Sequence, residues 1–186
     1  NREFYLTTSP SMDILISSNL ERLIYLIAGC DDAKNTELMK KLNSEGSYII
    51  TDEMKENLND FIGGFATEEE TAERIKALYE KTGYVLDTHT AVASHVYEQY
   101  VKETGDTTKT VIASTASPFK FGQSVMEAID GKVHDEDMFE LVETLSKTAN
   151  VAIPNAVEEL KTAPVLHDNI CEKDGMKDII KQFLGM

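Results

Sequence analysis

Helix patterns outnumber strand patterns along this chain, and that imbalance limits the folds that it can adopt. Helical spacing of apolar residues predicts helices over residues 16–27, 67–83, 87–105, 117–131, 135–147, 154–161 and 174–184, with shorter ones near 38–42 and 52–62. Only residues 47–50, 84–86 and 109–113 have the composition of short strands. Short strands between amphipathic helices indicate an α/β fold, but three strands cannot form a complete doubly wound sheet. We therefore expect a predominantly helical part of an α/β domain, with the missing strands in an absent part of the protein.

Composition predicts a packed core and excludes two classes of partner. The chain has 186 residues, of which 41% are hydrophobic and 27% charged, as in ordinary globular domains. With 33 Asp and Glu against 18 Lys and Arg, the net charge is −15. Nucleic acids and anionic membrane surfaces need a cationic patch, and no basic run is present. No apolar run approaches the length of a membrane span, and residues 31–65 read as a more polar peripheral region of a segment that spans 1–186.

The cysteines and the first residue bear on compartment and origin. Cys30 and Cys171 are isolated and form no CxxC pattern, so neither a disulfide framework nor a metal site is expected. A reducing, cytoplasmic location is the simplest interpretation. Because the first residue is Asn1 and not Met, we expect the chain to be a processed or excised piece of something longer.

The first polar segment is TTSPSMD, residues 7–13. Ser9 before Pro10, or Ser11 before Met12, would cap the helix whose apolar residues run from 16 to 27, and Asp13 adds a carboxylate. Free N–H groups at a helix N-terminus make a good anion site. Simple capping explains the same residues, so both interpretations stay open.

Two further segments are more polar than the start of an ordinary helix requires. In DTHTAV, residues 87–92, a cap explains Asp87 but does not explain His89 beside Thr90, although a lone histidine is more often structural than functional. In VIASTASPFKF, residues 111–121, Ser114 and Thr115 follow the strand predicted over 109–113. Ligands gather at the carboxyl ends of strands in α/β sheets, but an ordinary strand-to-helix connection would look the same.

These three segments carry a family resemblance. TTSPSMDILISSNLERLIY, YVLDTHTAVA and ASTASPFKF resemble signature stretches of threonine synthases and occur in the family's order, and PNAVEELKTAPVLHDNICEKDGMKDIIKQFL is similar to the family's C-terminal end. The resemblance covers essentially the whole chain. It implies a partial tryptophan synthase β-like domain, of the fold type II shared by one class of pyridoxal-phosphate enzymes. It also implies a lyase of threonine biosynthesis that converts O-phosphohomoserine and water to threonine and phosphate.

The resemblance also implies roles for particular residues. The Schiff-base lysine and the glycine-rich cofactor loop would lie upstream, and nothing here matches the lysine motif; no residue, Lys120 included, is assigned a catalytic role, and the segment alone should be inactive. Thr115, with Ser114 as second choice, would face the pyridine nitrogen of pyridoxal phosphate. Five residues would bind or surround the anionic substrate: Ser9, Ser11, Asp13, His89 and Thr90.

Two departures and two alternatives accompany this interpretation. Thr88 stands where the family usually has proline, a change expected to cost little, and Ser117 stands where it usually has histidine, which removes a contact if that histidine touches a ligand. The chain could instead be a non-enzymatic acidic helical binding module, or one half of a split pyridoxal-phosphate enzyme. A truncated domain exposes apolar area and a sheet edge, so a homodimer through that face is expected.

Overall fold

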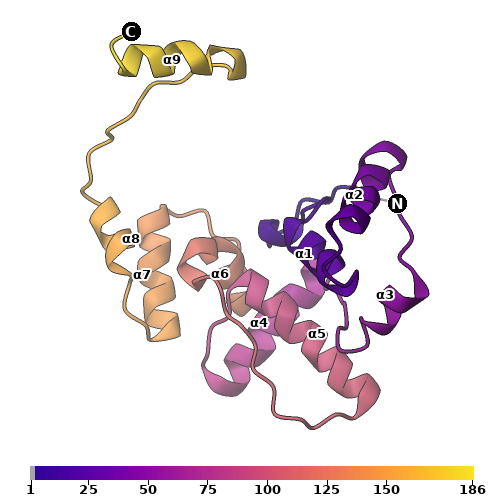
Figure 1. Cartoon of the computed structure of the whole chain (residues 1–186). Coiled ribbons are helices and arrows are strands. Elements are labelled where there is room, and N and C mark those ends of the chain that lie inside the picture. The colour runs from indigo at the N-terminus through magenta and orange to yellow at the C-terminus, as the bar shows by residue number, and fades with distance from the viewer. Residues whose placement is uncertain (1–2) are drawn as a thin grey trace. The chain divides into compact units, whose positions relative to one another are not determined.

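The computed structural model describes residues 3–186, which form helices joined by turns and irregular segments (Figure 1). The chain divides into two compact units, one ending at Asn150 and the other comprising Val151–Met186. In the first unit the helices are α1 (Ser18–Ile27), α2 (Asp32–Glu45), α3 (Asp52–Glu56), α4 (Glu68–Thr82), α5 (Thr88–Thr104), α6 (Gly122–Asp130) and α7 (Met138–Ala149). Two 3-10 turns, η1 (Pro10–Met12) and η2 (Pro118–Phe121), complete it.

The helix-start and helix-stop signals are confirmed where they are strongest. Thr67 and Glu70 form the predicted capping box of α4, in which each side chain accepts the other residue's backbone N–H. Asp87 caps α5 as expected, and Gly83 and Gly105 end α4 and α5 in the left-handed conformation that glycine adopts without strain. The helix predicted over 52–62 is shorter, since α3 ends at Glu56.

Helices α1, α2 and α3 share a small core. Ile24, Ile27, Leu38 and Met54 are its buried members. The first helix begins later than predicted: Ser17 caps it, so neither Ser9 nor Ser11 is its N-cap. Leu20, which helical spacing placed on the core face, is 51% exposed. It points away from this core because only one side of the helix packs against α2.

Helix α4 is the centre of a second core, packing against α5 and α6, and α6 packs in turn against α7 (Figure 1). Ile75 of α4, Val125 of α6 and Leu145 of α7 are almost completely buried. Helix α5 is unusual because the side chains buried at its N-terminal end are mostly polar. They are Thr88, His89, Thr90 and Ser94. A helix that buries hydroxyls and an imidazole must satisfy them internally, and those partners define the site described below.

The predicted strands are not formed within residues 3–186. A strand is held by hydrogen bonds to a neighbouring strand, and residues 109–113 have none; they run as an irregular segment with Val111 92% exposed. Residues 110–113 and one face of α5 line an open, largely apolar groove of about 470 Å³. The prediction of a strand over 109–113 was therefore wrong, because no neighbouring strand pairs with this segment within the described residues.

A histidine with two carboxylates orders the connection between α6 and α7. His134 Nδ1 lies 2.7 Å from Glu136, and its Nε2 lies 3.2 Å from Asp130 at the end of α6. The hydrogen bond with Glu136 is the main cause of a raised pKa for His134, and the same bond lowers the pKa of Glu136. The pKa of Asp130 is lowered chiefly by the backbone N–H of Lys132.

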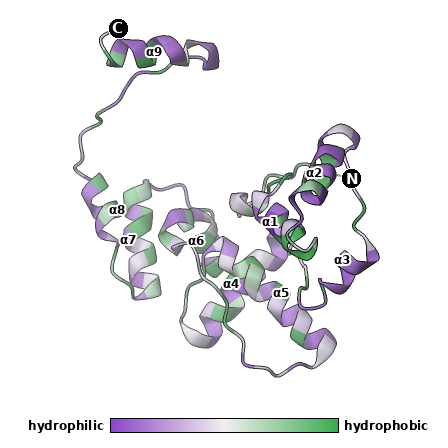
Figure 2. Ribbon diagram, in the orientation of Figure 1, coloured by the Kyte–Doolittle hydropathy of each residue, from purple (hydrophilic) through white to green (hydrophobic). Residues whose placement is uncertain are grey.

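The second unit contains α8 (Asn155–Leu160), a 3-10 turn η3 (Lys173–Gly175) and α9 (Met176–Phe183). None of these elements buries a residue. Helix α9 mixes hydrophobic and hydrophilic residues (Figure 2), and its Ile180 and Phe183 are more than half exposed. Within the described residues, no helix is both long enough and apolar enough to cross a membrane.

Candidate functional site

The loop that precedes α1 is closed on itself by Asp13. One carboxylate oxygen of Asp13 accepts the backbone N–H of Thr7 at 2.8 Å, and the other accepts the Thr7 hydroxyl at 2.7 Å. Thr7 Oγ1 in turn accepts the backbone N–H of Ser9 at 3.1 Å. Asp13 therefore holds the loop in shape, while Ser9 is buried and Ser11 is exposed.

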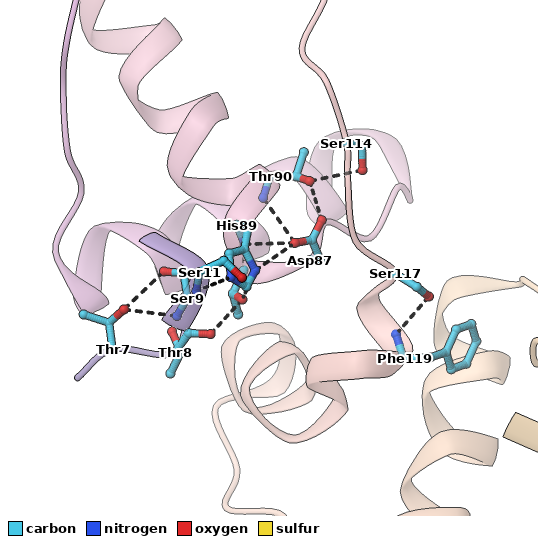
Figure 3. Close-up of polar contacts among 11 residues, drawn as sticks. Thr7, Thr8, Ser9, Ser11, Asp87, His89, Thr90, Ser114, Ser117 and Phe119 are labelled. Carbon is cyan, nitrogen blue, oxygen red and sulfur yellow. Dashed lines mark hydrogen bonds and ion pairs between the residues drawn. The ribbon is translucent and has the colours of Figure 1, made fainter. Parts of the chain in front are cut away.

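Two hydrogen bonds tie this loop to the start of α5. The Thr88 hydroxyl donates to the carbonyl oxygen of Thr8 at 2.8 Å, and the backbone N–H of Ser11 donates to His89 Nε2 at 3.2 Å. From the other side, Glu68 at the start of α4 accepts the backbone N–H of Thr8 at 3.1 Å. Residues separated by about eighty positions are thereby held together, as Figure 3 shows for Thr8, Ser11 and His89.

Asp87 is the polar centre of the site. Its side chain is buried, and it accepts the backbone N–H groups of His89 at 2.9 Å and Thr90 at 3.3 Å. It also accepts the Thr90 hydroxyl. A carboxylate at this position is favoured by the free N–H groups and the positive end of the helix dipole. The sequence predicts this cap, but it does not predict the burial of the Asp87 side chain or its contact with a third donor.

The third polar segment reaches the same cluster through Ser114. Ser114 Oγ and Thr90 Oγ1 lie 3.1 Å apart. The Thr90 hydroxyl also reaches the Asp87 carboxylate, so Ser114 joins the cluster through Thr90. The neighbouring Thr115 is exposed, and no hydrogen bond to its hydroxyl is present within residues 3–186.

Residues 117–121 of the third segment make a cap and packing contacts rather than hydrogen bonds to the cluster. Ser117 accepts the backbone N–H of Phe119 at 3.4 Å and so caps η2, and Phe119 is buried. The Phe121 ring lies with its centroid 4.8 Å from that of His89. Lys120 Nζ lies 5.7 Å from the centroid of the Phe121 ring. Figure 3 shows Ser117 and Phe119 apart from the hydrogen-bonded cluster.

The structure thus joins most of the predicted site residues into one network. Ser11, His89, Thr90 and Ser114 are connected directly or through Thr88 and Asp87. Ser9 and Asp13 are joined to each other through Thr7 in the same loop as Ser11, and Thr115 adjoins Ser114 in the chain. Sequence reasoning missed the hydroxyls of Thr7 and Thr88 and the ring of Phe121. The departure at Thr88, expected to cost little, is a buried residue with two polar partners. Within residues 3–186, no three His, Cys, Asp or Glu side chains are grouped to hold a metal ion.

Known proteins match most of this chain. Residues 90–165 match the family model described as threonine synthase, C-terminal. Human threonine synthase-like 1 is 38% identical over 136 residues, which are 73% of this chain and 18% of that protein. Threonine synthase of Saccharomyces cerevisiae is 36% identical over 140 residues, 67% of this chain and 27% of that protein.

Two solved structures resemble the whole or most of the chain. Threonine synthase from yeast has a TM-score of 0.78 at 27% identity and covers 100% of this chain and 38% of its own. Pyridoxal-phosphate-bound threonine synthase from Brucella melitensis has a TM-score of 0.59 at 31% identity, over 86% and 34%. The chain therefore spans between 18% and 38% of these relatives. The neighbours confirm the predicted fold class, part of a fold type II domain.

Proposed function

We propose that this chain, which corresponds in sequence and fold to the C-terminal segment of threonine synthases, supplies one wall of the active site of a pyridoxal-phosphate-dependent threonine synthase. The reaction would be the conversion of O-phosphohomoserine and water to threonine and phosphate. One observation carries the proposal: three polar segments, distant in the sequence, are joined by hydrogen bonds into a single cluster that leaves the hydroxyls of Ser11 and Thr115 exposed.

Thr115 fits the cofactor better than Ser114 does. The Thr115 hydroxyl has no partner among the described residues, so its hydrogen is available to a pyridine nitrogen, whereas Ser114 is already hydrogen-bonded to Thr90. A neutral hydroxyl does not protonate such a nitrogen, because its own pKa is far too high. Pyridoxal phosphate, when bound, would supply an electron sink for bonds at the substrate α-carbon. The chain's part is to place a hydroxyl beside the ring.

For the anionic substrate, the loop of residues 7–13 offers hydroxyls and no cation. The Ser11 hydroxyl is exposed and is the best placed to donate to a phosphate oxygen, with Ser9 behind it. Asp13 acts indirectly, because both of its oxygens are engaged by Thr7. Cationic groups that neutralise the substrate phosphate would have to come from outside this loop.

The chain alone is proposed to be inactive, since the lysine that joins the cofactor would lie in the part of the enzyme it does not include. The test is a titration of the isolated chain with pyridoxal phosphate, followed by absorbance, together with a phosphate-release assay on O-phosphohomoserine. We expect no release of phosphate and no stable shift of the cofactor spectrum. Turnover by the isolated chain would show that one of its own lysines takes the role, and the proposal would fail.

Thr115→Ala in the full-length protein is expected to weaken pyridoxal-phosphate affinity by roughly 5- to 30-fold, the worth of one hydrogen bond of about 1–2 kcal/mol. Equilibrium dialysis measures the dissociation constant. Thr115→Ser keeps the hydroxyl and should stay within about twofold of the parent, while Thr115→Val keeps the shape and should behave like alanine. Equal affinity of all four proteins would remove Thr115 from the cofactor site.

The exposed apolar surface supports the expected self-association. Val111, which lines the apolar groove beside α5, is exposed. We propose that a homodimer covers this surface when the rest of the enzyme is absent, and sedimentation velocity across a hundredfold range of concentration tests it; a monomer throughout would refute it. Cys30 and Cys171 are free and exposed, which fits the proposed cytoplasmic location.

A further inference from the structure

His89 is the point at which all three polar segments meet. Its Nε2 faces the backbone N–H of Ser11 at 3.2 Å. Its Nδ1 lies 3.3 Å from Thr88 Oγ1 and 3.4 Å from Asp87 Oδ1. The ring packs against Phe121, and only 6% of the residue is exposed. An imidazole in this position has no nitrogen left over for a ligand.

The two ends of this chain of contacts determine which nitrogen carries the proton. A backbone N–H can only donate, so Nε2 opposite Ser11 must be unprotonated. A backbone carbonyl can only accept, so the Thr88 hydroxyl hydrogen must be directed to Thr8 at 2.8 Å. The Thr88 oxygen is then free to accept, and Nδ1–H is the donor that reaches it. Asp87 Oδ1 lies 3.4 Å from Nδ1 on the same side.

We infer that His89 is a positioning residue: a neutral imidazole protonated at Nδ1, which couples the backbone of Ser11 to Thr88 and Asp87 and so holds the loop of residues 7–13 against the N-terminus of α5. The inference revises the expectation that His89 contacts the substrate. Its consequence for catalysis rests on the proposed function, because the loop matters to turnover only if the Ser11 hydroxyl meets the substrate. The connection that His89 makes between the loop and α5, called the tie below, does not depend on the proposed function.

Thr88 completes the connection between the loop and His89. It is buried, and its one hydroxyl both donates to Thr8 and accepts from His89. A proline at the first position of α5 would be tolerated by the helix but would offer neither contact. The Nδ1–H of His89 would then have only Asp87 to reach, and the loop would keep the Ser11 bond but lose the Thr8 bond.

The direct test is the tautomer of His89 in the unmodified chain. Long-range proton–nitrogen NMR on a sample labelled at histidine nitrogen distinguishes the protonated from the unprotonated ring nitrogen. With four histidines in the chain, the His89 signals are assigned by their loss in His89→Gln. We expect a protonated Nδ1 and an unprotonated Nε2 at neutral pH. The opposite tautomer, or a rapidly exchanging mixture, would overturn the inference.

Amide exchange provides a second measurement. In His89→Phe, which keeps a ring beside Phe121 but no nitrogen, we expect the Ser11 amide to exchange at least about 10-fold faster, since it loses the acceptor that it has among residues 3–186. His89→Gln offers a side-chain oxygen and should restore part of the protection. The matched control is His95→Gln on the same helix, because His95 lies beside Glu70 and not beside the loop. If His95→Gln and His89→Phe changed Ser11 equally, the tie would be refuted.

Inorganic phosphate separates this inference from the proposed function. If the tautomer and the exchange pattern are as expected but phosphate leaves the Ser9 and Ser11 amide signals unchanged, the tie holds and the anion role of the loop fails. A response to phosphate that is reduced several-fold in His89→Phe and recovers in His89→Gln supports both.

Discussion

Asp87→Ala is expected to lower the free energy of unfolding by about 2–4 kcal/mol, more than an ordinary loss of a helix cap. The carboxylate is almost completely buried, and three donors from His89 and Thr90 would lose their acceptor at once. Removal of a buried charge returns part of its desolvation cost, which keeps the loss within this range. Urea denaturation followed by circular dichroism measures it.

Two comparisons isolate the buried network from capping alone. Asp31 caps α2 by accepting the backbone N–H of Lys34 at 2.9 Å, but Asp31 is exposed, so Asp31→Ala should cost only about 1 kcal/mol. Asp87→Asn keeps one oxygen for the helix N–H groups and should fall between the two. If Asp87→Ala and Asp31→Ala cost the same, burial adds nothing, and Asp87 is a cap like any other.

Local signals along the sequence account for most of the helices. Helix caps act within one turn, so they can be predicted from consecutive residues without the rest of the fold. The examples here are the capping box at Thr67, the carboxylate of Asp87 and the glycines at 83 and 105. The same local reasoning failed at Ser9 and Ser11. A serine before an apolar stretch is a sound helix start, but here the chain first makes a 3-10 turn, and the backbone N–H of Ser11 in that turn is bonded to His89 of α5.

The candidate site shows the same division. Its three segments could be found from their excess of hydroxyls and from the family resemblance, because both are written in consecutive residues. Which side chains contact one another could not be found in this way. Thr88 next to His89 looks like a minor departure in sequence, and only the carbonyl of Thr8 and the amide of Ser11 reveal that the pair works as one connection. The strand over 109–113 failed for a related reason, since pairing depends on residues that lie elsewhere.

Gly64→Ala is expected to lower the free energy of unfolding by about 1–3 kcal/mol, because the added methyl group has no room. A Cβ at Gly64 would lie 2.6 Å from Cγ1 and 3.0 Å from Cγ2 of Val96 on α5. Valine is stiff at χ1, so neither methyl group can rotate away without a less favourable rotamer. The segment before α4 would have to move off the face of α5 that lines the groove beside residues 110–113.

The adjacent glycine is the matched control. A Cβ at Gly63 would meet nothing within 4 Å, so Gly63→Ala should be neutral or should stabilise the chain by up to about 1 kcal/mol through the unfolded state. Val96→Ala removes both methyl groups that obstruct position 64. In the double variant with Gly64→Ala, we therefore expect a loss at least about 1 kcal/mol smaller than the sum of the single losses. If the two single losses simply added, the clash would not be the cause, and a loss of backbone freedom at position 64 would explain the effect instead.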